Sequence, residues 1–168
     1  MLTIPNLLSF ARIPLAAAFV AVHGTGPRLA LLVAASLTDL LDGWLARMGT
    51  TTRLGALLDP IADKTFILFA LSAFLFDGTL GTADYFVILS RDLATAVGFL
   101  VAYWLPGLDP ADFKARWPGK FVMMLQLAAL FALLLRPALI PWVVPVIAAF
   151  SLWAIVDYTL YLARVRAT

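Results

Sequence analysis

Long apolar segments separated by short polar connections occupy almost the whole chain, and this pattern limits the possible fold more than any other feature. Hydrophobic residues make up 63% of the 168 residues, charged residues make up only 13%, and the mean hydropathy is +0.98. Soluble domains are about half apolar and about one quarter charged. The composition therefore predicts an integral membrane protein. The absence of cysteine excludes disulfides, thiolate metal sites and cysteine nucleophiles.

The length accommodates six membrane-spanning helices of about 20 residues joined by short loops. We predict an all-α membrane protein in which residues 1–168 form a single domain, because no room remains for a second one. We expect no signal peptide, since the N-terminus lacks a basic leader and Arg12 lies within the first apolar segment. Breaks at glycine, proline and charged residues delimit the spans. The expected spans are Ile4–Val22, Arg28–Arg47, Leu54–Phe76, Asp84–Leu105, Phe121–Leu135 and Pro141–Leu162.

Basic residues are distributed unequally between the two sides that six spans define. Only Arg28 and Arg136 fall on the side away from the termini. The positive-inside rule therefore predicts that both termini are cytoplasmic, in a multi-pass protein of the cytoplasmic (inner) membrane. The basic residues on the side of the termini are Arg47, Arg53, Lys114, Arg116, Lys120, Arg164 and Arg166.

Four aspartates interrupt the apolar sequence of the second and third spans. Asp39 and Asp42 are three residues apart, and Asp59 and Asp63 are four apart, so each pair lies on one face of a helix. The short polar connection Met48–Arg53 predicts a helical hairpin with two carboxylates on each arm. Helical rise places these carboxylates at similar depth, about 8 to 14 Å below the cytoplasmic surface.

Four carboxylates close together within membrane spans are energetically unfavourable unless a cation neutralises their charge. An ionised aspartate near the centre of a span costs roughly 2.5 to 3.5 kcal/mol, and the carboxylates would also repel one another. Either some are protonated or a cation lies among them. Hard carboxylate oxygens without cysteine or histidine nearby favour Mg²⁺ or Mn²⁺ over zinc or copper. We predict a site for two divalent ions, formed by Asp39, Asp42, Asp59 and Asp63.

Two arginines lie well inside expected spans. Asn6, Ser9 and Arg12 share one side of the first span, and Arg12 lies about 12 Å into it, which favours an inward-facing role over snorkelling. Arg91 and Asp92 lie in the fourth span. Adjacent helical residues point about 100° apart, so we do not expect a simple mutual pair. Arg91 is expected to bind either a buried aspartate or a substrate phosphate.

The polar stretch before the fifth span contains Lys114, Arg116 and Lys120. For Lys114 an ordinary basic cytoplasmic loop is the better interpretation. Lys120 follows a Pro-Gly pair and could reach back to a phosphate. Beside the aspartates, Gly43 suggests close approach of a ligand, whereas Ala46 fits ligand approach and helix packing equally well.

Carboxylate-bound metal ions surrounded by arginine and lysine suit chemistry at phosphorus. The metals would neutralise phosphate oxygens, and a spare carboxylate could take a proton from an attacking hydroxyl. These residues alone do not separate a transferase from a phosphatase. Two other interpretations are a transporter whose intramembrane aspartates bind the transported cation, and a scaffold that uses them only for helix pairing. A transporter would need carboxylates nearer the midplane and few phosphate-binding arginines.

The pattern Asp39-x-x-Asp42-Gly43-x-x-Ala46-Arg47, followed by Gly55-x-x-x-Asp59-x-x-x-Asp63, resembles the signature of the CDP-alcohol phosphatidyltransferases. Eight specified positions in fixed order make the resemblance specific. Seven residues, Met48–Leu54, separate the two halves, where the family usually has eight or more, and the difference falls in the connecting loop.

The resemblance implies a homodimeric enzyme of phospholipid biosynthesis. It would transfer a phosphatidyl group from CDP-diacylglycerol to an alcohol, release CMP and have no nucleic-acid partner. Asp39, Asp42 and Asp59 would hold the metals together with Asp63, which is also best placed as the general base. The CDP-lipid site would then comprise Gly43 and Ala46 beside the cytidine, Arg47 at the nucleotide end, Asn6 and Arg12 at the pyrophosphate, and Gly55.

The acceptor is implied by finer resemblances. The opening PNLLSFAR is similar to that of phosphatidylglycerophosphate synthases, although Gly98 and Val122-Met123 stand where those tend to have a second arginine and a Lys-Thr pair. Arg91-Asp92 with Gln126 is instead similar to the cardiolipin synthases of the family, which use phosphatidylglycerol. We rank glycerol 3-phosphate first, phosphatidylglycerol second and inositol phosphate third. The expected acceptor-binding residues are Arg91, Lys120 and Arg116.

Overall fold

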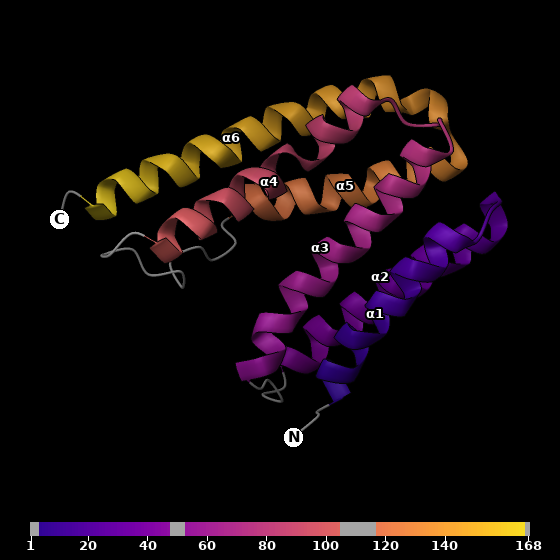
Figure 1. Cartoon of the computed structure of the whole chain (residues 1–168), viewed down its shortest axis with the longest axis horizontal. Helices are drawn as coiled ribbons and strands as arrows, with labels where there is room; N and C mark the ends of the chain where they lie inside the picture. Colours follow the sequence, from indigo (N-terminus) through magenta and orange to yellow (C-terminus); the bar gives the residue numbers. More distant parts are fainter. Residues whose placement is uncertain (1–3, 48–52, 105–116, 167–168) are drawn as a thin grey trace. The chain divides into compact units, whose positions relative to one another are not determined.

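The computed structural model describes residues 4–47, 53–104 and 117–166, and within these ranges the side chains of residues 10–41, 62, 64–98 and 117–160 (Figure 1). Every element in the described ranges is helical, with six α-helices and one short 3-10 helix, η2. The all-α prediction is therefore confirmed. The elements are α1 (Ile4–Ala21), α2 (Thr25–Arg47), α3 (Arg53–Phe76), α4 (Thr82–Trp104), α5 (Trp117–Leu135), η2 (Pro137–Leu139) and α6 (Ile140–Arg166).

Two helices begin about one turn earlier than the sequence predicted, and both contain a proline in their first turn. α2 begins at Thr25 and includes Pro27, and α5 begins at Trp117 and includes Pro118. Proline is tolerated there because first-turn N–H groups have no partner within the helix. The prolines that we interpreted as breaks therefore lie inside the starts of helices.

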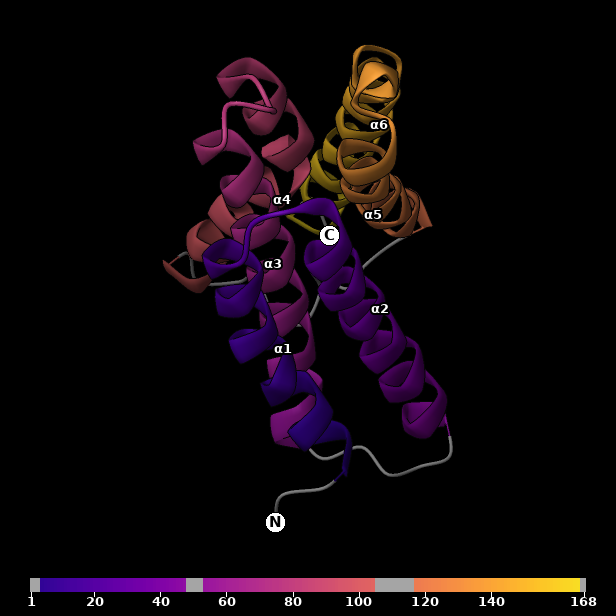
Figure 2. The same ribbon diagram turned by 90° about the vertical axis from the view of Figure 1, so that its right-hand side faces the viewer.

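The chain divides into two compact units, the first of which comprises residues 1–80 and 130–137. In this unit α1 packs against both α2 and α3. Figure 2 shows the start of α1, the end of α2 and the start of α3 at one end of the unit, as the predicted hairpin requires. Phe19 of α1 forms edge-to-face contacts with Phe66 and Phe74 of α3, at ring distances of 5.9 and 5.8 Å. These rings join α1 to α3.

A buried arginine joins the three helices at the other end of this unit. Arg28 donates to the carbonyl oxygens of Phe19 and Val22, at 3.3 and 2.9 Å, and forms an ion pair with Asp77 just beyond α3. Its guanidinium also lies over the rings of Phe19 and Phe74. The carbonyls at the end of a helix lack partners within the helix, and a cation there is favourable. Arg28 is thus a packing residue.

The second unit comprises residues 81–129 and 138–168, and in it α4 packs along α6 (Figure 1). Ile88, Val122, Ile147 and Ala154 are among its buried apolar residues, whereas α6 leaves Trp142 and Leu152 exposed. In the described part of the chain, two helical segments are long and apolar enough to cross a membrane, Trp117–Leu135 and Pro137–Leu160. The prediction of six spans with cytoplasmic termini goes further than this finding and stays a prediction.

Replacing Arg28 tests its role as the link between helices. We expect Arg28→Gln to lower the free energy of unfolding by about 1 to 3 kcal/mol, because Asp77 and two helix-terminal carbonyls lose their donor. Thermal unfolding of the purified protein in detergent would measure this. The matched control is Arg136→Gln, at an exposed arginine, which should leave the midpoint unchanged. Equal midpoints for the two variants would contradict the assignment.

Candidate functional site

The four predicted metal ligands lie on the two antiparallel helices of the first unit. Asp39 and Asp42 lie on α2, and Asp59 and Asp63 lie on α3, at the end where α2 terminates and α3 begins. Of these four side chains the structure describes that of Asp39. The side chains of Asn6, Asp42, Gly43, Ala46, Arg47, Gly55, Asp59 and Asp63 lie outside the described ones, and their predicted roles stay predictions.

Arg12 contacts the first of the aspartates. Its side chain is only 2% exposed, and Nη2 lies 3.5 Å from Oδ1 of Asp39. Its Nε donates to the hydroxyl of Thr38 at 3.4 Å, and that hydroxyl donates to the carbonyl of Ala35 at 2.7 Å. The inward-facing role predicted for Arg12 is therefore confirmed. Its assignment to the pyrophosphate stays a prediction.

Asp39 has the properties that a metal ligand needs. Its side chain remains 49% exposed although Arg12 lies against one oxygen, so the carboxylate is accessible. Carboxylate oxygens are the ligands that Mg²⁺ and Mn²⁺ prefer. Among the described side chains no group of three potential metal ligands is found, and Asp39 is the one predicted ligand among them. The described part of the site is compatible with a divalent ion.

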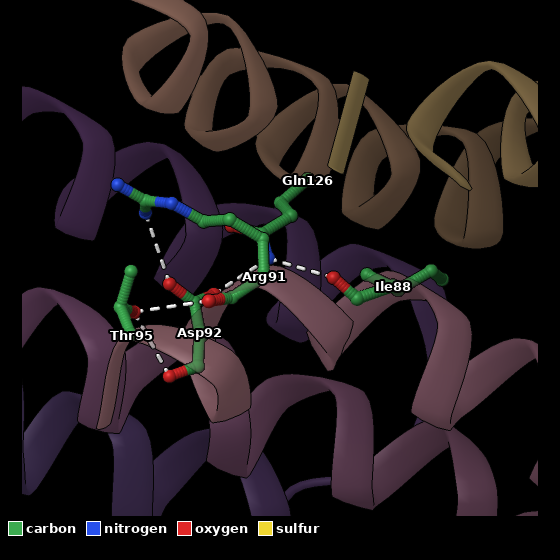
Figure 3. A network of polar contacts seen from close by, with 5 residues as sticks. All are labelled: Ile88, Arg91, Asp92, Thr95 and Gln126. Carbon is green, nitrogen blue, oxygen red and sulfur yellow. Dashed lines mark hydrogen bonds and ion pairs between the residues drawn. The ribbon is translucent and has the colours of Figure 1, made fainter. Parts of the chain in front are cut away.

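A network of polar side chains lies inside the second unit, around Arg91 of α4 (Figure 3). Arg91 is buried, and its Nη1 donates to Oδ1 of Asp92 at 3.0 Å. Our expectation that these neighbours would not pair was wrong. Their Cα–Cβ bonds diverge, but the arginine side chain is long enough for its guanidinium to fold back onto the adjacent carboxylate. Of the two anions considered for Arg91, the structure shows an aspartate.

Gln126 of α5 completes this network. It is 1% exposed, and its amide donates to Oδ2 of Asp92 at 2.7 Å and to the carbonyl of Ile88 at 2.8 Å. Asp92 therefore accepts hydrogen bonds on both oxygens, one from α4 and one from α5. The sequence singles out Gln126 only as part of the pattern, with Arg91-Asp92, that is similar to the cardiolipin synthases. Its isolation within an apolar segment was the signal that could have identified a buried partner.

The first turn of α5 lies against the same arginine. Gly119 is buried, and a Cβ built there would lie only 3.1 Å from Cζ of Arg91, closer than ordinary van der Waals contact. The next residue, Lys120, is exposed, and its ammonium lies 5.5 Å from the ring centre of Trp117. The structure thus brings α5 to Arg91 one residue before Lys120. The third predicted acceptor-binding residue, Arg116, lies outside the described residues, as does Lys114.

Comparison with known proteins agrees with the resemblance seen in the aspartate motif. The CDP-alcohol phosphatidyltransferase family profile matches residues 2–156. The chain belongs to this family. Its members are membrane-bound transferases of phospholipid synthesis, which agrees with the composition and with the two long apolar helices.

Relatives within the family carry the names of two different enzymes. The chain is 37% identical over 103 residues to a CDP-diacylglycerol–glycerol-3-phosphate 3-phosphatidyltransferase of Aquifex aeolicus, covering 58% of each chain. It is 35% identical over 144 residues to the Pectobacterium atrosepticum enzyme of the same name, covering 80% of this chain and 78% of that one. A rat cardiolipin synthase (CMP-forming) is 36% identical over 153 residues, covering 80% and 51%. The chain thus spans little more than half the length of the Aquifex and rat relatives.

Gln126 offers a test of the Arg91 network that does not depend on activity. We expect Gln126→Met to lower the free energy of unfolding by about 1 to 2 kcal/mol, because Asp92 and the Ile88 carbonyl lose a buried donor while the volume changes little. The thermal midpoint in detergent would report this. Met124→Leu, at a side chain that is 69% exposed on the same helix, is the control and should not move the midpoint. An unchanged midpoint for Gln126→Met would show that the network does not stabilise the fold.

Proposed function

We propose that this protein transfers a phosphatidyl group from CDP-diacylglycerol to an alcohol acceptor and releases CMP. The observation that supports this most directly is the buried Arg12 held against Asp39, the first residue of the family motif, with half of that carboxylate exposed. A scaffold would have no need of an accessible carboxylate. A transporter would have no need of the phosphate-binding residues that the family motif supplies.

Asp39, Asp42, Asp59 and Asp63 would hold two Mg²⁺ or Mn²⁺ ions. When bound, these ions would neutralise the phosphate oxygens of the CDP-lipid. Asp63 would take the proton of the acceptor hydroxyl. The oxygen of that hydroxyl would form a bond to the phosphatidyl phosphorus, and the bond from phosphorus to CMP would break. Arg12 would orient Asp39 and bind the pyrophosphate. Asn6 would bind the pyrophosphate as well, and the rest of the CDP-lipid site would consist of Gly43, Ala46, Arg47 and Gly55.

For the acceptor we propose glycerol 3-phosphate first and phosphatidylglycerol second. Arg91 lies beside the first turn of α5, and Lys120 in that turn adds a second cation, so Arg91, Lys120 and Arg116 would bind the acceptor phosphate. Phosphatidylglycerol is favoured by the similarity to a cardiolipin synthase. The partial neutralisation of Arg91 by Asp92 favours it too, because a phosphodiester has less negative charge to compensate.

We further propose a single domain over residues 1–168 with six spans, both termini and the metal site at the cytoplasmic face of the inner membrane, and a homodimer as the assembly. The distribution of basic residues supports this orientation, because only Arg28 and Arg136 fall on the side away from the termini.

Release of CMP tests the proposal. We expect the purified protein to release CMP from CDP-diacylglycerol with Mg²⁺ or Mn²⁺ when glycerol 3-phosphate or phosphatidylglycerol is supplied, and to stop when EDTA removes the metal. Asp63→Asn should lower the rate by about 100-fold or more, because amide nitrogen cannot accept the proton.

The matched control is Asp84→Asn, at an acidic residue in the first turn of α4, which should keep the wild-type rate. Size-exclusion chromatography should give the same elution volume for both variants. A wild-type rate for Asp63→Asn would eliminate Asp63 as the base. No CMP release with any acceptor would contradict the proposed reaction.

The role of Arg91 can be tested separately. We expect Arg91→Lys to raise the KM for the acceptor by about tenfold, because lysine keeps the charge but loses the planar donor fork. Gly119→Ala should also raise the KM for the acceptor, by a smaller factor, because the added Cβ displaces the guanidinium of Arg91. The KM for CDP-diacylglycerol should not change in either variant, and Gly26→Ala, where a Cβ meets nothing within 4 Å, should change neither constant. A raised donor KM would place Arg91 at the nucleotide instead.

A further inference from the structure

Two neighbouring residues of α2 share one buried arginine of α1. Nε of Arg12 donates to Oγ1 of Thr38 at 3.4 Å, and Nη2 lies 3.5 Å from Oδ1 of Asp39. The guanidinium is a planar fork, and Nε and Nη2 lie on the same edge of it. One edge of Arg12 is therefore divided between a hydroxyl and a carboxylate.

That edge is one with which arginine can hold both oxygens of a carboxylate at once. Such a bidentate pair has two parallel N–H···O bonds, with N···O distances of about 2.7 to 2.9 Å. The distance from Nη2 to Asp39 is longer, at 3.5 Å, and the Nε beside it is occupied by Thr38. Arg12 thus lies against Asp39 without enclosing it, and that side chain stays 49% exposed.

The hydroxyl of Thr38 is oriented to accept from Arg12. It donates its own proton to the carbonyl of Ala35 at 2.7 Å, within α2. A hydroxyl has one proton and two lone pairs, so a proton directed to the backbone leaves the lone pairs of Oγ1 for the Nε–H of Arg12. The backbone of α2 thereby fixes the acceptor that holds Nε.

Without this hydroxyl the guanidinium would bind Asp39 differently. A buried donor that loses its acceptor is unfavourable, so Nε would need another one. Asp39 already contacts Nη2 on the same edge, and a small rotation would bring its second oxygen to Nε. Both carboxylate oxygens would then be occupied by the arginine. A metal ion would have to compete for them.

We propose that Thr38 is a positioning residue of the metal site. It holds Nε of Arg12, so that the arginine supports Asp39 through one oxygen and leaves the carboxylate accessible to a divalent ion. The proposal rests on the proposed function, which it extends by naming a residue that controls how well Asp39 binds the metal. Thr38 would act through Arg12 and touch neither metal nor substrate.

Manganese binding tests this role without requiring turnover. Isothermal titration of Mn²⁺ into the purified protein in detergent should show binding by the wild type, and Asp39→Asn should weaken it. Thr38→Val keeps the shape of the side chain and should weaken Mn²⁺ binding by about tenfold or more, which is typical for a group that orients a metal ligand. Thr38→Ser keeps the hydroxyl and should bind Mn²⁺ as tightly as the wild type does.

The matched control is Ser36→Ala on the same helix. Its hydroxyl donates to the carbonyl of Leu32 at 2.8 Å, so the substitution removes a backbone-bonded hydroxyl away from Arg12 and should leave Mn²⁺ binding unchanged. A purely structural role for Thr38 would lower the thermal midpoint of Thr38→Val and leave its affinity for Mn²⁺ as in the wild type. That result would overturn the proposal. Should Thr38→Val fail to fold, Thr38→Ala removes the same hydroxyl with a better helix former and should show the same loss.

A double-mutant cycle shows whether Thr38 acts through Arg12. Lysine has no Nε–H edge to divide, so adding Thr38→Val to Arg12→Lys should weaken Mn²⁺ binding no further. An equal loss of affinity in both backgrounds would show that Thr38 acts independently of the arginine, and would overturn the proposal.

CMP release separates failure of this role from failure of the reaction. Wild-type protein that binds no Mn²⁺, or Thr38→Val that binds it as tightly as Ser36→Ala, would overturn the role of Thr38. CMP release by the same wild-type preparation would then leave the transferase proposal intact. Mn²⁺ binding that is weakened in Thr38→Val, without CMP release by the wild type, would support the role of Thr38 and reject the transferase.

Discussion

Charge burial in an apolar chain is the constraint on which the described structure depends. A buried guanidinium among apolar helices needs a carboxylate or carbonyl partner, because its surroundings supply no water or counter-ion. Each of the three buried arginines in the described part of the chain lies against an aspartate. These pairs are Arg12 with Asp39, Arg28 with Asp77, and Arg91 with Asp92. Two of them join different helices of the first unit, so helix positions and charge neutralisation are determined together.

The pairs differ in what they leave accessible, and this difference separates packing from function. Arg28 also donates to two helix-terminal carbonyls and stacks on two rings, so its contacts join helices. Arg12 instead holds an aspartate whose side chain stays half exposed, and Arg91 lines a cavity between α4 and α6. Arg12 and Arg91 are also the residues that the family resemblance assigns to the donor and to the acceptor.

Local sequence was sufficient to predict the helices but not all of their starts. The first helix was predicted as Ile4–Val22 and observed as Ile4–Ala21, because an apolar segment bounded by glycine and proline has few alternatives. The fifth begins four residues before the predicted Phe121, because Pro118 is compatible with a first turn. That shift matters for the site, since it brings Gly119 against Arg91 and Lys120 into the helix. The packing role of Arg28 could not be predicted for a related reason: its position at the start of a span said nothing about the ring and carbonyl contacts that form around it.

The sequence by itself determined the helical class, the spacing of the four aspartates and the inward position of Arg12, because periodicity and hydropathy depend on neighbours along the chain. Only the tertiary structure decided which anions the arginines bind, that Gln126 bridges α4 and α5, and that α4 and α6 enclose a cavity lined by Gly98 and Thr159. These features depend on how far a long side chain folds back and on which helices lie side by side. Neither property follows from the order of residues within a single helix.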